Sequence, residues 1–363
     1  MKKIQTLTIS LLIIMTVACQ NKEEKRKKYS IMNQEEVKPE FEWVENLNCP
    51  PGYPVEVYQG GLEGAGLTNG TSTGLRGWGS YGAGTSYGKK RLPGYIDCIW
   101  VSYAERCVYS INCDIDYKKL VEVFEEGYQD SDFFFNGNGE YKKCTFNTVI
   151  VGFAPGGVCV IWAFGPGKQV EIGRYQGEKY QVPQQEIDKL DNHDRLLFSP
   201  KEYDRIMNNI RIVPLAIREA NAGKPIPYGV WDSYRTRFNW RPVVETVNEG
   251  IADFIYFKMI NGEKEQLFDL ALKENKFKKR AVPIVIGIGW KDTKGQGYAG
   301  TLDFDEKEIT AAFKAMYKES PDQEAELVLM VNYTNNHITS LLRSGDNEIR
   351  LPKTEVNIFK TRK

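Results

Sequence analysis

The sequence has only two histidines and no surplus of charge of either sign. Across 363 residues, 48 basic side chains balance 48 acidic ones. A protein that binds nucleic acid as its main partner usually carries a basic surplus, so we expect no nucleic-acid partner. His193 lies in a polar loop and His337 opens a strand, and neither has a cysteine or a second histidine at ligand spacing. We therefore assign no metal and no cofactor.

The sequence also gives little support to a catalytic site. It has no Gly-Lys-Ser/Thr and no strand–Gly-x-Gly-x-x-Gly–helix pattern, which argues against a phosphate-binding loop. The serines Ser102 and Ser110 have no assignable base. Two acidic pairs each precede a predicted helix, where a carboxylate caps free N–H groups: Asp114 with Asp116, and Asp303 with Asp305. We assign no catalytic residue and keep a carboxylate-dependent envelope hydrolase as an alternative.

The apolar run at the N-terminus is too short to span a membrane comfortably, because a span needs about 20 apolar residues. It follows Met1-Lys2-Lys3 and ends at Cys19, so residues 1–18 predict a signal peptide. The small residues before Cys19 resemble a bacterial lipobox, with Thr16 in place of the usual Leu. We expect Cys19 to carry lipid and to hold the chain at a membrane of the cell envelope, the outer membrane. The alternative is an ordinary signal peptide with a chance cysteine.

Residues 19–42 are charged and poor in apolar side chains, which predicts a disordered tether. Lys22-Glu23-Glu24 is similar to the surface-export signal of Bacteroidetes lipoproteins, and a solvated linker is the alternative. The chain has seven cysteines, an awkward number for complete disulfide pairing. Lipidation of Cys19 leaves six, and buried thiols or one or two disulfides are both open.

The rest of the chain predicts an α+β fold in two related units. We expect an N-terminal unit over 43–177, a helical and irregular connector over 178–240, and a C-terminal unit over 241–363. Each unit is predicted to be a mostly antiparallel sheet with a helix on one face. A weak internal repeat supports this plan, because six of seven residue pairs are identical at a constant spacing. The first copy has Tyr109, Asp114, Asp116, Lys118, Leu120, Phe124 and Tyr128; the second has Tyr298, Asp303, Asp305, Lys307, Ile309, Phe313 and Tyr317.

Two other segments stand out. Pro155, Gly156 and Gly157 separate the apolar runs 148–153 and 158–164, which predicts a hairpin whose turn needs a positive φ at glycine. The stretch Gly60–Gly88 has eleven glycines in 29 residues and predicts a long surface loop. Its aromatic residues Trp78, Tyr81 and Tyr87 make it a candidate partner-binding loop. The tryptophans are either core residues or a sugar platform: Trp78, Trp100, Trp162, Trp231, Trp240 and Trp290.

Several short motifs together resemble a known bacterial lipoprotein family, the domain of unknown function 2931. They are the lipobox, Tyr53-Pro54-Val55-Glu56-Val57, Gly77-Trp78-Gly79, Leu92-Pro93, Ile99-Trp100-x-Ser102 and the hairpin Val151–Gly157. The resemblance covers residues 43–240 and implies no catalytic residue. It does imply that the conspicuous glycines and tryptophans are structural.

These features predict a non-enzymatic, lipid-anchored envelope protein that binds a macromolecular partner. An immunity-type lipoprotein that neutralises a toxin is one version of this hypothesis. A surface glycan-binding lipoprotein is an alternative from a different class, as is the hydrolase. Membrane contact through the lipid and a protein or glycan partner are the interactions that we expect.

Overall fold

The computed structural model describes residues 38–361 except 69, 83, 85 and 132–140. The chain divides into two compact units, Met1–Glu40 and Phe41–Lys363, and the fold described below is that of the second unit. The predicted signal peptide, Cys19 and residues 19–37 of the predicted tether lie outside the described residues. Among the residues that are described, no helix is both long and apolar enough to cross a membrane.

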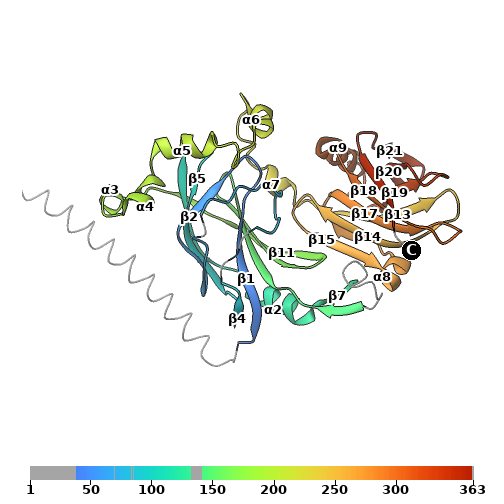
Figure 1. The fold of residues 1–363 in the computed structure, drawn as a ribbon, viewed down its shortest axis with the longest axis horizontal. Helices are drawn as coiled ribbons and strands as arrows, with labels where there is room; N and C mark the ends of the chain where they lie inside the picture. The colour runs from blue at the N-terminus through green and yellow to red at the C-terminus, as the bar shows by residue number, and fades with distance from the viewer. Residues whose placement is uncertain (1–37, 69, 83, 85, 132–140, 362–363) are drawn as a thin grey trace, which may run out of the picture. The chain divides into compact units, whose positions relative to one another are not determined.

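The first half of the chain forms two sheets around one core (Figure 1). The strand order is β11-β10-β9-β1-β4 in one sheet and β12-β6-β5-β2-β3 in the other. Buried side chains of both sheets, such as Trp43 and Trp100, form the core, to which helix α2 (Tyr117–Glu126) adds Leu120 and Phe124. The strands are β1 (Glu40–Asn48), β2 (Val55–Leu62), β3 (Ala65–Gly66), β4 (Gly88–Arg91), β5 (Tyr95–Ser102), β6 (Cys107–Asp114), β7 (Tyr128–Ser131), β8 (Tyr141–Cys144), β9 (Thr148–Ala154), β10 (Val158–Gly165), β11 (Lys168–Gln176) and β12 (Glu178–Tyr180).

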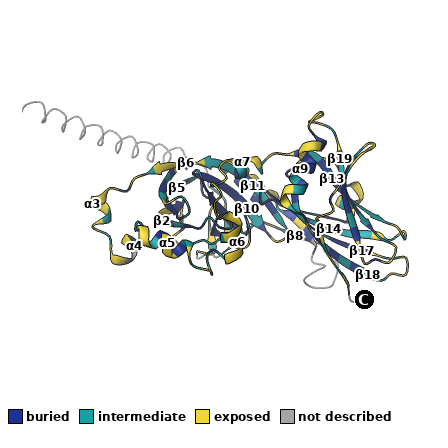
Figure 2. Ribbon diagram, turned by 90° about the horizontal axis from the view of Figure 1, so that it is seen from above, coloured by how far each residue is buried: buried dark blue, intermediate teal, exposed yellow. Residues whose placement is uncertain are grey.

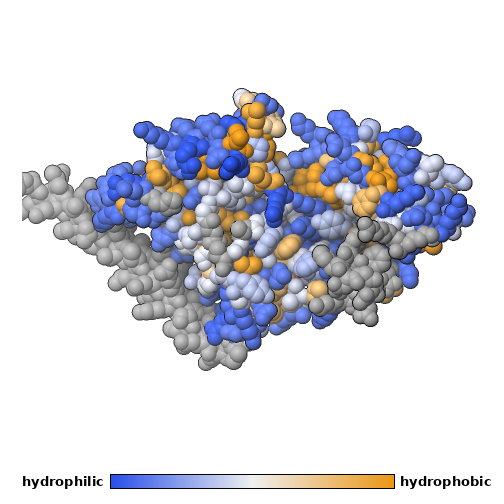
Figure 3. Space-filling view, in the orientation of Figure 1, coloured by the Kyte–Doolittle hydropathy of each residue, from blue (hydrophilic) through white to orange (hydrophobic). Residues whose placement is uncertain are grey.

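A helical segment follows β12. It holds α3 (Gln184–Ile187), α4 (Asn192–Leu196), α5 (Pro200–Met207), α6 (Leu215–Asn221) and α7 (Val230–Ser233). Helix α5 begins after Ser199, although the Ser199 side chain makes no capping bond, and α6 begins only after Pro214. Figure 2 draws α3 and α4 largely as exposed. Apolar side chains gather on the surface near α6 in Figure 3, where Leu215 is exposed.

The second half also contains strands of two sheets and a hydrophobic core. Helix α9 (Glu306–Met316) packs Ile309 and Phe313 into this core, and Asp305 caps it by accepting a bond from the Glu308 N–H at 2.8 Å. Asp116 caps α2 in the same way, so both predicted caps are confirmed. The remaining elements are β13 (Phe238–Thr246), β14 (Ile251–Met259), β15 (Lys264–Phe268), α8 (Asp269–Glu274), β16 (Lys278–Arg280), β17 (Pro283–Lys291), β18 (Gly297–Asp303), β19 (Ala325–Val331), β20 (Ile338–Ser344), β21 (Asn347–Arg350) and β22 (Glu355–Lys360).

Strand pairing in the two halves follows one order. β13 runs parallel to β19 as β1 runs parallel to β9, and β14 pairs antiparallel with β17 as β2 pairs with β5. Corresponding rings also make corresponding contacts. Trp100 stacks on Tyr109 with centroids 5.3 Å apart, and Trp290 stacks on Tyr298 at 5.4 Å.

The sequence predicts a separate sheet in each half, and this expectation is wrong, because the two halves share one sheet. A ten-stranded sheet of order β22-β18-β17-β14-β15-β11-β10-β9-β1-β4 runs through both. Strands β11 and β15 join them, with Gln169 opposite Lys264. The structure is a mixed fold of helices and strands, dominated by strands in several sheets, and it does not confirm a division into two units. The junction escaped prediction because one paired position leaves no periodic pattern in the sequence.

Candidate glycine-rich loop site

The glycine-rich stretch leaves β2, forms the short strand β3, and returns at β4. Its described residues follow a path that only glycine allows at two close approaches. Gly74 has a φ of +65°, and a Cβ there would lie 2.2 Å from the Cys49 carbonyl oxygen. Gly79 has a φ of +70°, and its Cβ would lie 2.8 Å from the Cα of Gly262. The glycines therefore allow the loop to lie directly on neighbouring backbone.

Three buried polar side chains of β1 hold this loop. Asn48 Nδ2 donates to the carbonyl oxygens of Gly77 and Ser80 at 3.2 and 2.9 Å, and its Oδ1 accepts from the Gly79 N–H at 2.8 Å. Asn46 Oδ1 accepts from the Gly82 N–H at 2.8 Å. Glu45 accepts from the Ser86 N–H at 2.9 Å. Because these side chains satisfy loop backbone that the strands cannot pair, they fix its conformation.

Glu45 also carries a negative charge at the end of the loop, where it pairs with Lys90. Burial by itself would raise its pKa, but hydrogen bonds from Ser86 and Lys90 outweigh burial and lower the pKa to about 2. Lys90 Nζ lies 3.2 Å from Glu45 Oε2 and 2.8 Å from Ser86 Oγ, and it lies over the Trp43 ring at 4.2 Å. The carboxylate is thus ionised at neutral pH and pairs with the ammonium group.

Ser86 lies in a Gly-x-Ser-x-Gly pattern, Gly84–Gly88, that the sequence analysis did not identify as a candidate. In hydrolases this pattern lies between a strand and a helix, whereas here it precedes strand β4. A carboxylate with a pKa of about 2 is a poor general base at neutral pH. The geometry therefore favours an anchoring role for Ser86.

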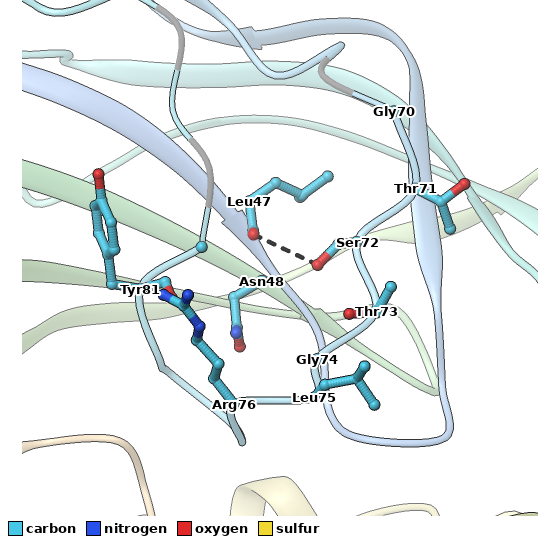
Figure 4. Close-up of a pocket in the computed structure, with 11 residues that line it drawn as sticks. Leu47, Asn48, Gly70, Thr71, Ser72, Thr73, Gly74, Leu75, Arg76 and Tyr81 are labelled. Carbon is cyan, nitrogen blue, oxygen red and sulfur yellow. Dashed lines mark hydrogen bonds between the residues drawn. The ribbon is translucent and has the colours of Figure 1, made fainter. Parts of the chain in front are cut away.

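An open cavity of about 460 Å³ lies between the loop and the end of β1 (Figure 4). Leu47 and Asn48 form one side, and loop residues form the other, including the charged side chain of Arg76 and the ring of Tyr81. Ser72 Oγ donates to the Leu47 carbonyl oxygen at 3.4 Å, the bond drawn dashed in Figure 4. Thr71 and Thr73 also line the cavity, and the Thr71 hydroxyl donates to Glu56 Oε2 at 2.5 Å. This set suits a ligand that has both anionic and hydrogen-bonding groups.

The three aromatic residues predicted for partner binding are not brought together. Trp78 is buried and packs edge-on against Trp162 at 5.0 Å. Tyr81 lines the cavity and stacks on Phe164 at 5.5 Å, while exposed Tyr87 donates to Glu42 at 3.2 Å. The six tryptophans considered for a sugar platform are all buried: Trp78, Trp100, Trp162, Trp231, Trp240 and Trp290.

The predicted hairpin turn at Pro155, Gly156 and Gly157 joins β9 to β10, which pair antiparallel. Gly156 has the predicted positive φ, +84°. Its N–H donates to the Glu105 carboxylate at 3.2 Å, and the same carboxylate accepts from the hydroxyls of Tyr109 and Tyr228 at 2.8 and 3.1 Å. The turn therefore has a structural role, connecting the β5–β6 turn with the helical segment.

Other residues with possible chemistry have structural partners. The carboxylates of Glu171 and Glu263 converge on Asn261 Nδ2, but each pairs with an arginine, at 2.8 and 2.7 Å, and neither lines the cavity. The cysteines of the described ranges form no disulfide: Cys49, Cys98, Cys107, Cys113, Cys144 and Cys159. In those same ranges, no three His, Cys, Asp or Glu side chains gather as a metal site would require.

The loop is predictable from the sequence, but the residues that shape it are not. Glu45, Asn46, Asn48 and Arg76 carry the site, and β1 itself was not among the predicted strands. The available signal was Glu45-Asn46-Leu47-Asn48, a polar run directly after Trp43-Val44. Its partners lie about 30 to 40 residues away, which a local pattern does not reveal.

No curated protein and no solved structure matches the chain. A family model does match, over residues 21–229, and its description reads "Protein of unknown function (DUF2931)". The match covers more than half of the chain, including the glycine-rich loop, the Pro155–Gly157 turn and the helical segment as far as Gly229. The chain therefore belongs to this family, as its sequence motifs predicted.

Proposed function

We propose that this protein is a lipid-anchored protein of the cell envelope that binds a partner protein through the cavity beside its glycine-rich loop. The observation that carries the proposal is the loop itself. Buried Asn48, Asn46 and Glu45 hold it in one conformation, and it presents exposed Leu75, Arg76 and Tyr81. Tyrosine and arginine on a preordered surface are typical of binding hot spots. Neutralisation of a toxin by an immunity-type lipoprotein is one form of this function.

Capture from an envelope extract tests the proposal, with the chain from Gln20 onward as bait. Leu75→Asp places a charge at the cavity, and Leu270→Asp does the same on exposed α8 of the second half. We expect a protein that is recovered with the unaltered chain and with Leu270→Asp, and at least ten-fold less with Leu75→Asp. Equal recovery with all three baits, or no recovered protein, would contradict the proposal.

The anchor is a separate part of the proposal. Lipid on Cys19 would keep the chain at the outer membrane, on either its periplasmic or its outer face, and would leave the six described thiols unmodified. Labelling with a palmitate analogue should mark the full-length protein and not Cys19→Ala. Equal labelling of both would exclude the anchor. Protease treatment of intact cells then distinguishes the two faces.

A serine hydrolase is the second candidate, and one observation favours it. Ser86 Oγ contacts both Lys90 and Glu45, within a Gly-x-Ser-x-Gly pattern. We expect that a fluorophosphonate probe does not label the protein, because Glu45 is a weak base there. Labelling that disappears in Ser86→Ala would favour the enzyme. A glycan platform has less support, because the tryptophans that would form it are buried.

We also infer that the two halves arose by duplication and act as two α+β units. The support is their common strand order together with the equivalent indole bonds, from Trp43 Nε1 to the Arg91 oxygen at 3.2 Å and from Trp240 Nε1 to the Ala281 oxygen at 3.1 Å. Expression of residues 238–363 alone tests the inference. A cooperative unfolding transition is expected, and an unfolded fragment would contradict it.

A further inference from the structure

Two lysines face each other across neighbouring strands beside the glycine-rich loop. Lys258 of β14 is directly opposite Lys264 of β15. Like charges at such positions repel each other and destabilise a sheet. The pair therefore calls for a compensating partner.

The surroundings of the pair connect it to the cavity. Lys258 Nζ donates to Ser80 Oγ at 2.9 Å and lies 3.5 Å from the Arg76 carbonyl oxygen. Lys264 Nζ lies 4.8 Å from the centroid of Phe164, the ring on which Tyr81 stacks. Arg76 and Tyr81 both line the cavity, so Lys258 contacts a lining residue and Lys264 contacts the ring on which another lining residue stacks.

None of the ion pairs between described residues includes Arg76, Lys258 or Lys264. Burial and, to a smaller extent, the charge of Lys258 lower the pKa of Lys264 to about 8. Burial also lowers the pKa of Lys258. A buried ammonium group without a counter-ion costs free energy that an anion would recover.

Arg280 shows how this fold neutralises a cation that is almost wholly buried, because its Nε lies 2.8 Å from Glu265 Oε2. The buried carboxylates Glu171 and Glu263 also pair with arginines, the more exposed Arg235 and Arg237, at 2.8 and 2.7 Å. Lys258 and Lys264 differ from Arg280 because no such carboxylate pairs with them among the described residues.

We propose that Arg76, Lys258 and Lys264 form a binding site for an acidic peptide segment of the partner protein. The inference rests on the proposed function and names the chemistry that its partner presents. Three separate cations suit several carboxylates along a chain, and exposed Leu75 beside them suits an apolar side chain of the same segment. A polysaccharide is less well suited, because the indole rings that could stack on several sugars are buried.

Fluorescence anisotropy with a labelled ten-glutamate peptide tests the site on the chain from Gln20 onward. The site variant is R76Q/K258Q/K264Q. The control K118Q/K201Q/K307Q removes the same charge from exposed positions. We expect the site variant to bind at least ten-fold more weakly and the control less than two-fold more weakly. Arg76→Gln alone should weaken binding about three-fold; because Arg76 is exposed, this variant tests the site even where the triple variant does not fold.

Equal losses in the two triple variants would overturn the site, because only net charge would then matter, and so would no loss in either. Tighter binding of polygalacturonate than of the peptide, with the same dependence on Arg76, would overturn the peptide in favour of a glycan. Failure here is distinct from failure of the proposed function. If recovery of a partner protein depends on Leu75 but not on Arg76, Lys258 or Lys264, the proposed function stands and only this site is rejected.

Discussion

The first half of the molecule has a glycine-rich loop where the second half has β15, α8 and β16. Along the chain, the loop lies between β2 and β5, and the other segment lies between β14 and β17. Each borders a cavity next to a corresponding strand. In the first half Leu47 and Asn48 of β1 line it, and in the second Val243 and Val244 of β13 do so.

The two cavities are similar in size but differ in chemistry. The second, of about 490 Å³, is lined largely by aliphatic side chains such as Ile251, Ile255 and Leu272. The first has hydroxyl groups, an amide and a guanidinium group. The comparison teaches that recognition is expected at the first cavity, where buried side chains of β1 hold a polar loop in place.

The largest loss of stability is expected when the hydrogen bonds from Asn48 to the loop are removed. Asn48→Leu leaves the Gly79 N–H and two carbonyl groups without their partner, and it should lower the free energy of unfolding by about 4 kcal/mol. Asn248→Leu in the second half removes one long bond, at 3.4 Å, and should cost less than about 1 kcal/mol. Urea unfolding measures both, and equal costs would show that the loop is not held by Asn48.

Local features of both halves could be predicted from the sequence, but the hydrogen bonds from β1 to the loop could not. Asp116 and Asp305 are local caps that act within three residues, and the Pro155–Gly157 turn is a local pattern as well. β1 pairs in parallel with β9, about 100 residues further along the chain, and the Lys258–Lys264 pair faces a loop about 180 residues earlier. Such contacts depend on tertiary packing, which leaves no sequence period to read.

The next largest effect concerns the contact between the loop and the second half. Gly79→Ala would place a Cβ 2.8 Å from the Gly262 Cα and 3.1 Å from Gln169 Nε2. Gly223→Ala is the matched control, because Gly223 has a similar φ of +68° but open space around it. We expect Gly79→Ala to lower the free energy of unfolding by about 3 kcal/mol and the control by about 1 kcal/mol. Equal values in a denaturant titration would mean that the loop does not lie on the second half.

A smaller and opposite effect is expected from Lys264→Met. The pKa of Lys264 falls from 10.5 to about 8 on folding, so between these values the unfolded chain holds a proton that the folded chain has released. The penalty of the charged amine is therefore full below about pH 8 and absent above pH 10.5. The variant should gain about 2 kcal/mol over the unaltered protein at pH 7, a gain that shrinks towards pH 10.5. A loss of stability at pH 7, or a constant difference across this range, would contradict it.

The smallest effect is a difference in the reaction rates of the thiols. It reports on the first half alone, because all described cysteines lie there. Burial raises the pKa of Cys49 to about 12, and Cys98 and Cys159 are also buried. We expect these three to react with maleimide at least ten-fold more slowly than the partly exposed Cys107 and Cys113 at pH 7. Peptide mass spectrometry identifies the sites, and equal rates at all five would show that the first half opens readily.

The most direct test of the account compares one cation from each cavity. Arg76→Gln and Lys273→Gln remove the same charge, from the cavity of the first half and from that of the second. The amount of partner protein captured from the envelope extract is measured for both variants and for the unaltered chain. The account predicts at least three-fold lower recovery with Arg76→Gln and unchanged recovery with Lys273→Gln. Unchanged recovery with Arg76→Gln, or a loss confined to Lys273→Gln, would contradict it.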